Sequence, residues 1–310
     1  MEGLQADPSF MSQHSLGGRD YLAALGVVLI WGTNFVAMKF GLRQLTPFQL
    51  GAGRYLFAIL PLLLFVRPPK LPARWVLLYG LFQGIGQFGL LFLSLKVGMS
   101  AALASVILQT QVFFTAFFGV ALLGEHIHRS LKLGLVLAAL GLGAFGVAIA
   151  GANTAVSPAG FALCLGAASM WAASNIIVRL ARKGTPEFEV IPFMVWSSLV
   201  PILPFVLLSL AFDPPASRAL WSALNWQTVA STAYLGWCAT IAGYAMWTGL
   251  LKRHPVNRVA PFSLGVPVVG IGAGMLLLGD QISGWQWAGI GLTVAALSAV
   301  VLGPRFIRTA

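Results

Sequence analysis

The 310-residue chain is strongly apolar, with 58% hydrophobic residues, 9% charged residues and a mean hydropathy of +0.86. These values exclude an ordinary soluble globular protein and indicate a membrane protein with several spans. The net charge of +11 would suggest a nucleic-acid partner in a soluble protein. In a membrane protein, loop cations instead set the orientation, so no nucleic-acid partner is expected. The two cysteines, Cys164 and Cys238, lie inside apolar segments, so no disulfide framework is expected.

A helix needs about 20 apolar residues to cross about 30 Å of hydrocarbon. The sequence therefore predicts an all-α membrane protein with ten transmembrane helices. In the first half they are expected at about residues 20–40, 47–66, 74–95, 101–123 and 131–150. In the second half they are expected at about residues 157–180, 188–212, 227–251, 256–278 and 284–302. Residues 1–19 contain no apolar core typical of a cleaved signal peptide, and they and residues 304–310 are expected to form short cytoplasmic tails.

The two halves of the chain repeat one pattern. The segment WGTNFVAMK at 31–39 is echoed by WAASNIIVR at 171–179, and LLGEHI at 122–127 is echoed by LLGDQI at 277–282. We therefore expect two five-helix repeats, at residues 20–152 and 153–303. Because five is odd, the second repeat must enter the membrane from the opposite side. Inverted repeats of this kind are typical of secondary transporters that work by alternating access.

Loop cations predict which side is cytoplasmic. With both termini inside, fourteen Lys and Arg fall on the inner side and four on the outer side, the latter being Lys39, Arg43, Lys96 and Arg218. This bias favours both termini in the cytoplasm.

Several motifs together resemble a known family. They are WGTNF at 31–35, RYLFA at 54–58, the run from AALAS at 101–105 to LGE at 123–125, residues 171–179, LLK at 250–252, and residues 261–280 ending in GD. Over about residues 20–303 the chain resembles an EamA-type member of the drug/metabolite transporter superfamily. The resemblance implies a ten-helix carrier of the bacterial inner membrane that exports amino acids or other metabolites, closest to exporters of aromatic amino acids and methionine.

Polar side chains inside spans are candidates for the substrate site, because they are costly in hydrocarbon unless satisfied. Gln83 and Gln87 are four residues apart and share one helix face. Gln109 and Gln111 lie about 200° apart on a helix, so at most one of them is expected to face a central cavity. Hydrogen bonds between helices are an equally good explanation for these amides.

Aromatic and amide residues recur at mid-membrane depth in both halves. Trp31 with Asn34, and Trp171 with Asn175, occupy related positions about eleven to fourteen residues into their spans. They are predicted to line a cavity, with simple packing as the alternative.

The eighth span adds Trp237, Tyr244 and Trp247 to the predicted cavity. An aromatic lining suits apolar or aromatic side chains, or a cation.

The ninth span carries Pro261 and Pro267, which interrupt backbone hydrogen bonding and are candidates for hinges or for exposing carbonyls to the substrate. The glycine pairs Gly80 and Gly84, and Gly270 and Gly274, predict close helix packing.

Charged residues are missing from the span centres. All carboxylates and histidines fall at termini, loops or span ends, so no buried proton acceptor is expected. Arg54 and Lys39 lie near the outer surface, where snorkelling or a structural role is expected. The predicted cavity is therefore neutral, with no cofactor and no metal.

The sequence thus predicts a monomeric carrier in membrane lipid that exports small metabolites, foremost apolar or aromatic amino acids, without being an enzyme. An exporter of neutral or cationic drugs is the alternative within the same superfamily. A membrane-embedded enzyme is a remote alternative, since the GEHIHR cluster at 124–129 is its sole candidate site and no nucleotide-binding, metalloprotease or triad motif occurs.

Overall fold

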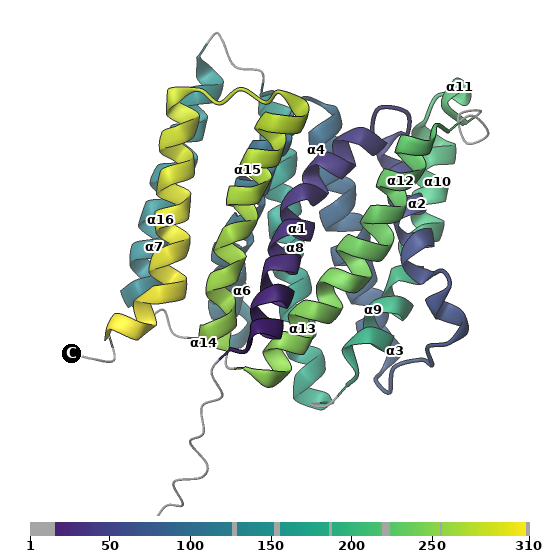
Figure 1. The fold of residues 1–310 in the computed structure, drawn as a ribbon, viewed down its shortest axis with the longest axis horizontal. Helices are drawn as coiled ribbons and strands as arrows, with labels where there is room; N and C mark the ends of the chain where they lie inside the picture. Colours follow the sequence, from purple (N-terminus) through teal and green to yellow (C-terminus); the bar gives the residue numbers. More distant parts are fainter. Residues whose placement is uncertain are drawn as a thin grey trace, which may run out of the picture.

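The computed structural model describes residues 16–125, 129–151, 156–185, 188–218, 224–254 and 256–307, and all regular structure within them is helical (Figure 1). Eight helical segments of this described part are long and apolar enough to cross a membrane. They are Gly18–Gly41, Ala73–Lys96, Ala101–Leu123, Arg129–Ala150, Pro158–Gly184, Val190–Phe212, Ala260–Leu278 and Gly284–Leu302. The prediction of an all-α membrane protein is confirmed.

The first half contains these elements: α1 (Gly18–Gly41), α2 (Pro47–Ile59), η2 (Leu62–Leu64), α3 (Ala73–Tyr79), η3 (Gly80–Gly89), α4 (Leu90–Lys96), α5 (Ala101–Ile107), η4 (Leu108–Thr110), α6 (Gln111–Leu123) and α7 (Arg129–Ala150). The second half contains α8 (Pro158–Gly184), α9 (Val190–Leu199), α10 (Ile202–Phe212), α11 (Pro215–Arg218), α12 (Trp226–Ala233), η6 (Tyr234–Ala242), α13 (Gly243–Arg253), α14 (Val256–Val259), η7 (Ala260–Leu264), α15 (Gly265–Leu278) and α16 (Gly284–Ile307).

Two predicted spans, at 47–66 and 227–251, are helical but are not among the eight. Helix α2 ends at Ile59 because Leu60 precedes Pro61, and a residue before proline is forced out of the helical region; Leu60 has ψ 135°. The second run, α12 to α13, is helical from Trp226 to Arg253. Both runs pack inside the bundle, α2 against α10 and η6, and α13 against α1.

Four helical runs change their winding midway, at matching places in the two halves. The elements η3 and η6 are π-helical stretches, each in the middle of a helical run. The elements η4 and η7 are 3₁₀ turns that lead into α6 and α15. Such interruptions are common at functional sites, because they alter the faces that side chains present.

The echo between 122–127 and 277–282 is a helix-ending motif. Gly124 and Gly279 end α6 and α15 with φ of 68° and 71°, a left-handed conformation that favours glycine. The following N–H groups, of Glu125 and Asp280, donate to Gly119 O at 3.2 Å and to Gly274 O at 3.1 Å. The described residues of the two halves therefore share a local structure as well as a sequence pattern.

The two helix ends lie at opposite ends of the bundle (Figure 1). Asp280 Oδ2 accepts from the N–H of Ala102 at the start of α5. The same helical run continues through η4 into α6 and finishes at Gly124. Helix α15 thus ends where that run begins.

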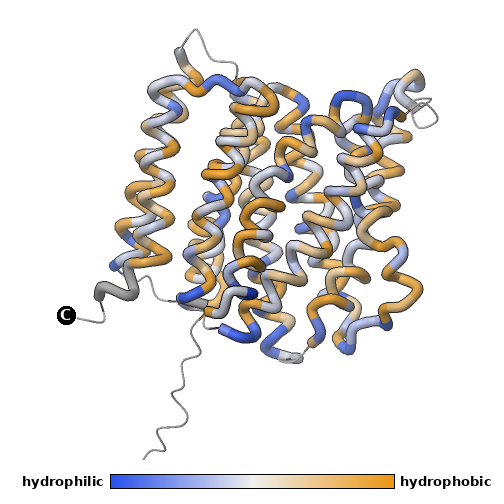
Figure 2. The backbone as a smooth tube through the Cα atoms, viewed as in Figure 1, coloured by the Kyte–Doolittle hydropathy of each residue, from blue (hydrophilic) through white to orange (hydrophobic). Residues whose placement is uncertain are grey.

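Helix α1 lies centrally and packs against α15, α13 and α12, while α7 and α16 form a pair at one margin (Figure 1). Helix α1 begins, and α16 ends, at the same end of the bundle. There, Asp20 of α1 accepts from Arg253 Nη2 at 2.9 Å and contacts His254 Nε2 at 2.8 Å, which ties the start of α1 to the end of α13. Hydrophobic residues run along the helices, and much of the strongest hydrophilic colouring lies in the connections at the two ends (Figure 2).

Glycines allow the close packing that the sequence predicts. A Cβ on Gly80 would meet Val200, and one on Gly84 would overlap the ring of Pro201. In the second half, Gly270 faces Ser105 in the same way. These glycines bring the backbones of neighbouring helices together.

Candidate functional site

Two adjoining cavities run into the bundle from one end. The wider one, here called the vestibule, has a volume of about 930 Å³, and the deeper one, here called the chamber, has a volume of about 270 Å³. Both are lined by Gln111, Val112, Trp171, Asn175, Tyr244 and Trp247, so the vestibule leads into the chamber. Small-molecule sites typically measure about 300–1,000 Å³, so the vestibule lies within that range and the chamber just below it.

The vestibule opens at the end where α1 begins. Its outer lining includes Glu125 after α6, Leu131 in the first turn of α7, Val190 at the start of α9, and Leu251 near the end of α13. Glu125 binds Arg179 at the mouth with an N to O distance of 2.9 Å, and both side chains are nearly half exposed. A pair with that exposure contributes little to stability.

Aromatic rings form one wall of the chamber. The Nε1 of Trp31 donates to Ala239 O at 3.0 Å, and its ring lies 5.1 Å from Tyr244 and 5.7 Å from Trp247. Trp171 lines the junction with the vestibule. The structure thus gathers Trp31, Trp171, Tyr244 and Trp247 in one place, as the sequence predicts.

Amides line the remaining walls. Asn34 and Gln87 face the chamber, and Asn175 donates to Gln111 Oε1 at 2.9 Å at the junction. Gln83 lies outside the chamber lining. It contacts Gln87 and Ser174 and lies 3.4 Å from the hydroxyl of Tyr244, so it supports groups that do line the chamber.

Gln109 and Gln111 both line the chamber, which corrects the prediction that at most one of them could. The 3₁₀ turn η4 covers Leu108–Thr110, and at three residues per turn positions two apart lie about 120° apart instead of 160°. With long side chains, both residues reach the cavity between them.

The prolines of the ninth predicted span do not line the chamber themselves, but they flank Ser263, Leu264 and Val266, which do. Pro261 is in η7 and Pro267 is in the first turn of α15. Because Pro267 has no N–H, the carbonyl of Ser263 lacks its usual helical donor, and Gln109 Nε2 lies 3.4 Å from it. Ser263 also lines the chamber, and its carbonyl accepts from the Gln109 amide there.

Trp237 does not line either cavity. It is 47% exposed, its Nε1 donates to Leu60 O at 2.7 Å, and its ring packs edge-on against Phe57. Trp237 is therefore removed from the predicted set of cavity-lining residues.

Arg54 is the main residue that sequence reasoning misplaced. It does not snorkel: it is 1% exposed, lines the chamber, and its guanidinium lies 3.7 Å above the ring of Phe88. Its Nε donates to Thr240 Oγ1 at 3.1 Å. The chamber therefore carries a positive charge and is not neutral. The signal available in the sequence was the position of Arg54 inside a span.

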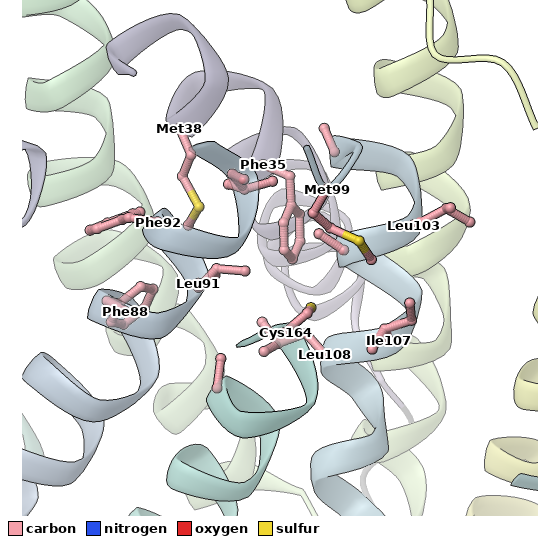
Figure 3. Close-up of a cluster of buried hydrophobic side chains, with 14 of the residues drawn as sticks. Phe35, Met38, Phe88, Leu91, Phe92, Met99, Leu103, Ile107, Leu108 and Cys164 are labelled. Atoms are coloured by element: carbon pink, nitrogen blue, oxygen red, sulfur yellow. The ribbon is translucent and has the colours of Figure 1, made fainter. Parts of the chain in front are cut away.

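The far end of the bundle is closed. Next to the chamber, side chains from α1, η3, α4, the α4–α5 connection, α5, η4 and α8 form a buried cluster, of which Phe35, Phe88 and Leu108 also line the chamber (Figure 3). Its labelled members are Phe35, Met38, Phe88, Leu91, Phe92, Met99, Leu103, Ile107, Leu108 and Cys164. We call this cluster the plug.

Polar contacts hold the closed end together outside the plug. Lys39 Nζ donates to Leu95 O at 2.8 Å, which joins the end of α1 to α4. Thr46 donates to Asp213 Oδ2 at 2.5 Å, and Asp280 accepts from Ala102 N at 2.9 Å. The described residues contain no cluster of three or more His, Cys, Asp or Glu that could hold a metal. The cluster at 124–129 lies partly outside the described residues.

Apolar spans surrounding a cavity with polar and aromatic walls define a multi-pass membrane protein. The EamA-like transporter family matches residues 19–146 and 158–302. The chain belongs to this family, and it is an inner-membrane protein.

Named relatives cover nearly the whole chain. A protein of Salmonella typhimurium (strain LT2) called "Probable amino-acid metabolite efflux pump" is 41% identical over 295 residues, covering 94% of this chain and 98% of the relative. A protein of Escherichia coli (strain K12) with the same description is 38% identical, covering 93% and 96%. An "Uncharacterized transporter" of Archaeoglobus fulgidus is 28% identical, covering 88% and 95%.

The fold is also similar to a solved crystal structure with a TM-score of 0.58 and 20% sequence identity, which covers 93% of this chain and 98% of the other. At that identity the likeness is one of fold alone.

Proposed function

We propose that this protein is a secondary transporter that exports amino acids and related small metabolites, chiefly those with apolar or aromatic side chains, by alternating access. The observation that carries the proposal is the chamber: about 270 Å³, walled by Trp31, Tyr244 and Trp247, adjoined by the vestibule and backed by the buried plug among the described residues. A chamber of this size accepts one small molecule. The two relatives described as amino-acid metabolite efflux pumps support the same substrate class.

The architecture that goes with this function is ten crossings in two inverted five-helix repeats, residues 20–152 and 153–303, with both termini in the cytoplasm. The matching helix ends at Gly124 and Gly279, which lie at opposite ends of the bundle, support the inversion. Cationic loops support the orientation. In that orientation the vestibule faces the cytoplasm, and the described conformation is the one that loads substrate. The protein is proposed to work as a monomer in lipid, with Pro261 and Pro267 near the moving junction of η7 and α15.

The charge of the chamber distinguishes the proposed amino-acid exporter from the main alternative, an exporter of neutral or cationic drugs. An exporter of cationic drugs needs a cavity that attracts cations, yet the charged residue that lines the chamber is Arg54. Like charges repel strongly where water is scarce. The structure therefore favours zwitterions or anions over drug cations. A membrane-embedded enzyme remains a remote alternative, because the EamA-like family is a transporter family.

Counterflow in proteoliposomes tests the proposal. Purified protein is reconstituted with a high internal concentration of one unlabelled amino acid, and entry of the labelled form is followed with and without a pH gradient. We expect saturable exchange of leucine, methionine or phenylalanine without the gradient, and we expect Trp171→Ala to depress it. Flux of lipophilic cations without any amino-acid exchange would refute the substrate class. Because no buried proton acceptor is expected, we propose that transport is facilitative, and exchange that strictly requires a pH gradient would refute this part of the proposal.

A further inference from the structure

Two buried polar atoms of the described side chains have no hydrogen-bond partner: Oδ1 of Asn34 and Nη1 of Arg54. The two residues are 7% and 1% exposed, and both line the chamber. Buried polar groups are nearly always satisfied, because an unpaired one costs free energy comparable to a lost hydrogen bond. Two such atoms at the same cavity point to partners that come from a ligand.

The positive charge of Arg54 is also uncompensated within the described residues. Its nearest contacts are the neutral hydroxyl of Thr240 and the face of Phe88. Four of the described carboxylates bind elsewhere: Asp20 to Arg253 and His254, Glu125 to Arg179, Asp213 to Thr46, and Asp280 to Ala102. An unpaired cation at this depth is costly, so a site that keeps it requires an anion.

The neighbourhood of Arg54 is arranged to hold the guanidinium in place without neutralising it. Stacking on Phe88 fixes its plane, and the Nε bond to Thr240 fixes its rotation. Thr240 is itself held, because its hydroxyl donates to Leu235 O at 2.9 Å. An oriented guanidinium with a free Nη1 is the usual partner of a carboxylate.

We propose that Arg54 binds the carboxylate of the substrate and that the side-chain carbonyl of Asn34 accepts a hydrogen bond from the ammonium group of the substrate. The pair would select molecules that carry both charges, while the aromatic wall of Trp31, Tyr244 and Trp247 takes the side chain. This inference rests on the proposed amino-acid transport and adds to it the groups that recognise the common part of every amino acid. It predicts broad tolerance of side chains combined with strict selection for the carboxylate.

A ligand series tests each charge separately. Leucine, methionine, phenylalanine and cysteine are each compared with the amine that lacks the carboxylate and with the acid that lacks the ammonium. For phenylalanine these are phenethylamine and 3-phenylpropionate. Binding to purified protein is measured by calorimetry, and by quenching of tryptophan fluorescence because several tryptophans line the chamber.

Arg54→Gln should lower the affinity for the amino acid and for the acid at least about tenfold, while leaving the affinity for the amine unchanged. Asn34→Leu should lower the affinity for the amino acid and for the amine but leave the affinity for the acid unchanged. Arg43→Gln is the matched control, since Arg43 also lies over a phenylalanine, Phe40, at 4.4 Å, but is exposed and outside the chamber. It should change none of the three.

Stability distinguishes binding from a structural role. Arg54→Met removes an uncompensated buried charge, so the melting temperature of the unliganded variant should equal or exceed that of the parent protein. A lower melting temperature together with an equal loss of affinity for all three ligand types would assign Arg54 a structural role and overturn the inference. Amines that bind the parent protein as tightly as the amino acids would overturn it as well.

The same series separates this inference from the proposed function. Amino acids that bind and are exchanged, but equally well in the parent and in Arg54→Gln, would overturn the role of Arg54 and leave the transport function standing. Acids that bind through Arg54 while no amino acid is exchanged would support the role of Arg54 and refute the function. No binding of any carboxylate by the parent protein would overturn the inference.

Discussion

Asp280 provides a sharp test of how the closed end is held. Its Oδ2 accepts from the N–H of Ala102 at 2.9 Å, where the helical run of α5, η4 and α6 begins. A hydrogen bond to a charged group contributes about 1.5–3 kcal/mol. Asp280→Ala leaves this N–H without its partner and destabilises the conformation in which α15 and α5 meet at this end. We therefore expect the closed end to open about 10 to 150 times more often.

A buried reporter measures this opening. Met99 is 0% exposed in the plug and lies three residues before Ala102. Met99→Cys is introduced after Cys164→Ala and Cys238→Ser have removed the native thiols. A charged thiol reagent is added from the side opposite the vestibule, and its rate of reaction reports the fraction of time that the closed end is open.

Glu125 supplies the matched control. It occupies the equivalent place in the first half, but its partner Arg179 is exposed, so the pair contributes about 0.2–1 kcal/mol. Glu125→Ala should change the Met99→Cys reaction rate by less than about fivefold. Equal rates in the parent and in Asp280→Ala, or equal acceleration by the two variants, would refute the reasoning.

Two further predictions concern packing and the aromatic wall. Gly84→Ala would place its Cβ against the ring of Pro201 and should cost about 1–3 kcal/mol, seen as a lower melting temperature in detergent, whereas Gly143→Ala has no neighbour within 4 Å and should cost nothing. Trp31→Phe removes the indole bond that orients the wall and should raise KM for amino-acid exchange about two- to tenfold. Trp237→Phe, which loses a similar bond outside the cavities, should leave KM unchanged.

Much of the fold is predictable because each half of the sequence carries its own apolar windows and helix-ending motif. Apolar windows give the membrane class, and the repeated LLG segments mark two helix ends that the structure shows with nearly equal φ at Gly124 and Gly279. Where proline follows directly, as at Leu60, the helix ends before the predicted span does. An average of hydropathy over this segment does not reveal the break, because Pro61 ends the helix while the residues around it remain apolar.

The site was predictable where depth and an ideal helix suffice, and not where the winding changes. Trp237 and Tyr244 are seven residues apart, almost two turns of an α-helix, and would share a face. The π-helical stretch η6 from Tyr234 to Ala242 makes fewer turns over the same length, so Trp237 points away from the chamber that Tyr244 lines. The same reasoning explains Gln109 and Gln111, which a 3₁₀ turn brings to one cavity.

Arg54 shows a different limit of sequence reasoning. A cation in a span is expected to reach for the surface, because its burial without a counter-ion destabilises the protein. Here the π-helical stretches η3 and η6 supply Phe88 and Thr240, which hold the guanidinium inside. A natural sequence breaks a local rule of stability mainly at sites of function. The unpaired Nη1 of Arg54 and the unpaired side-chain carbonyl of Asn34 are such breaks, and both residues line one chamber, as expected if the proposed ligand carries a negative and a positive group.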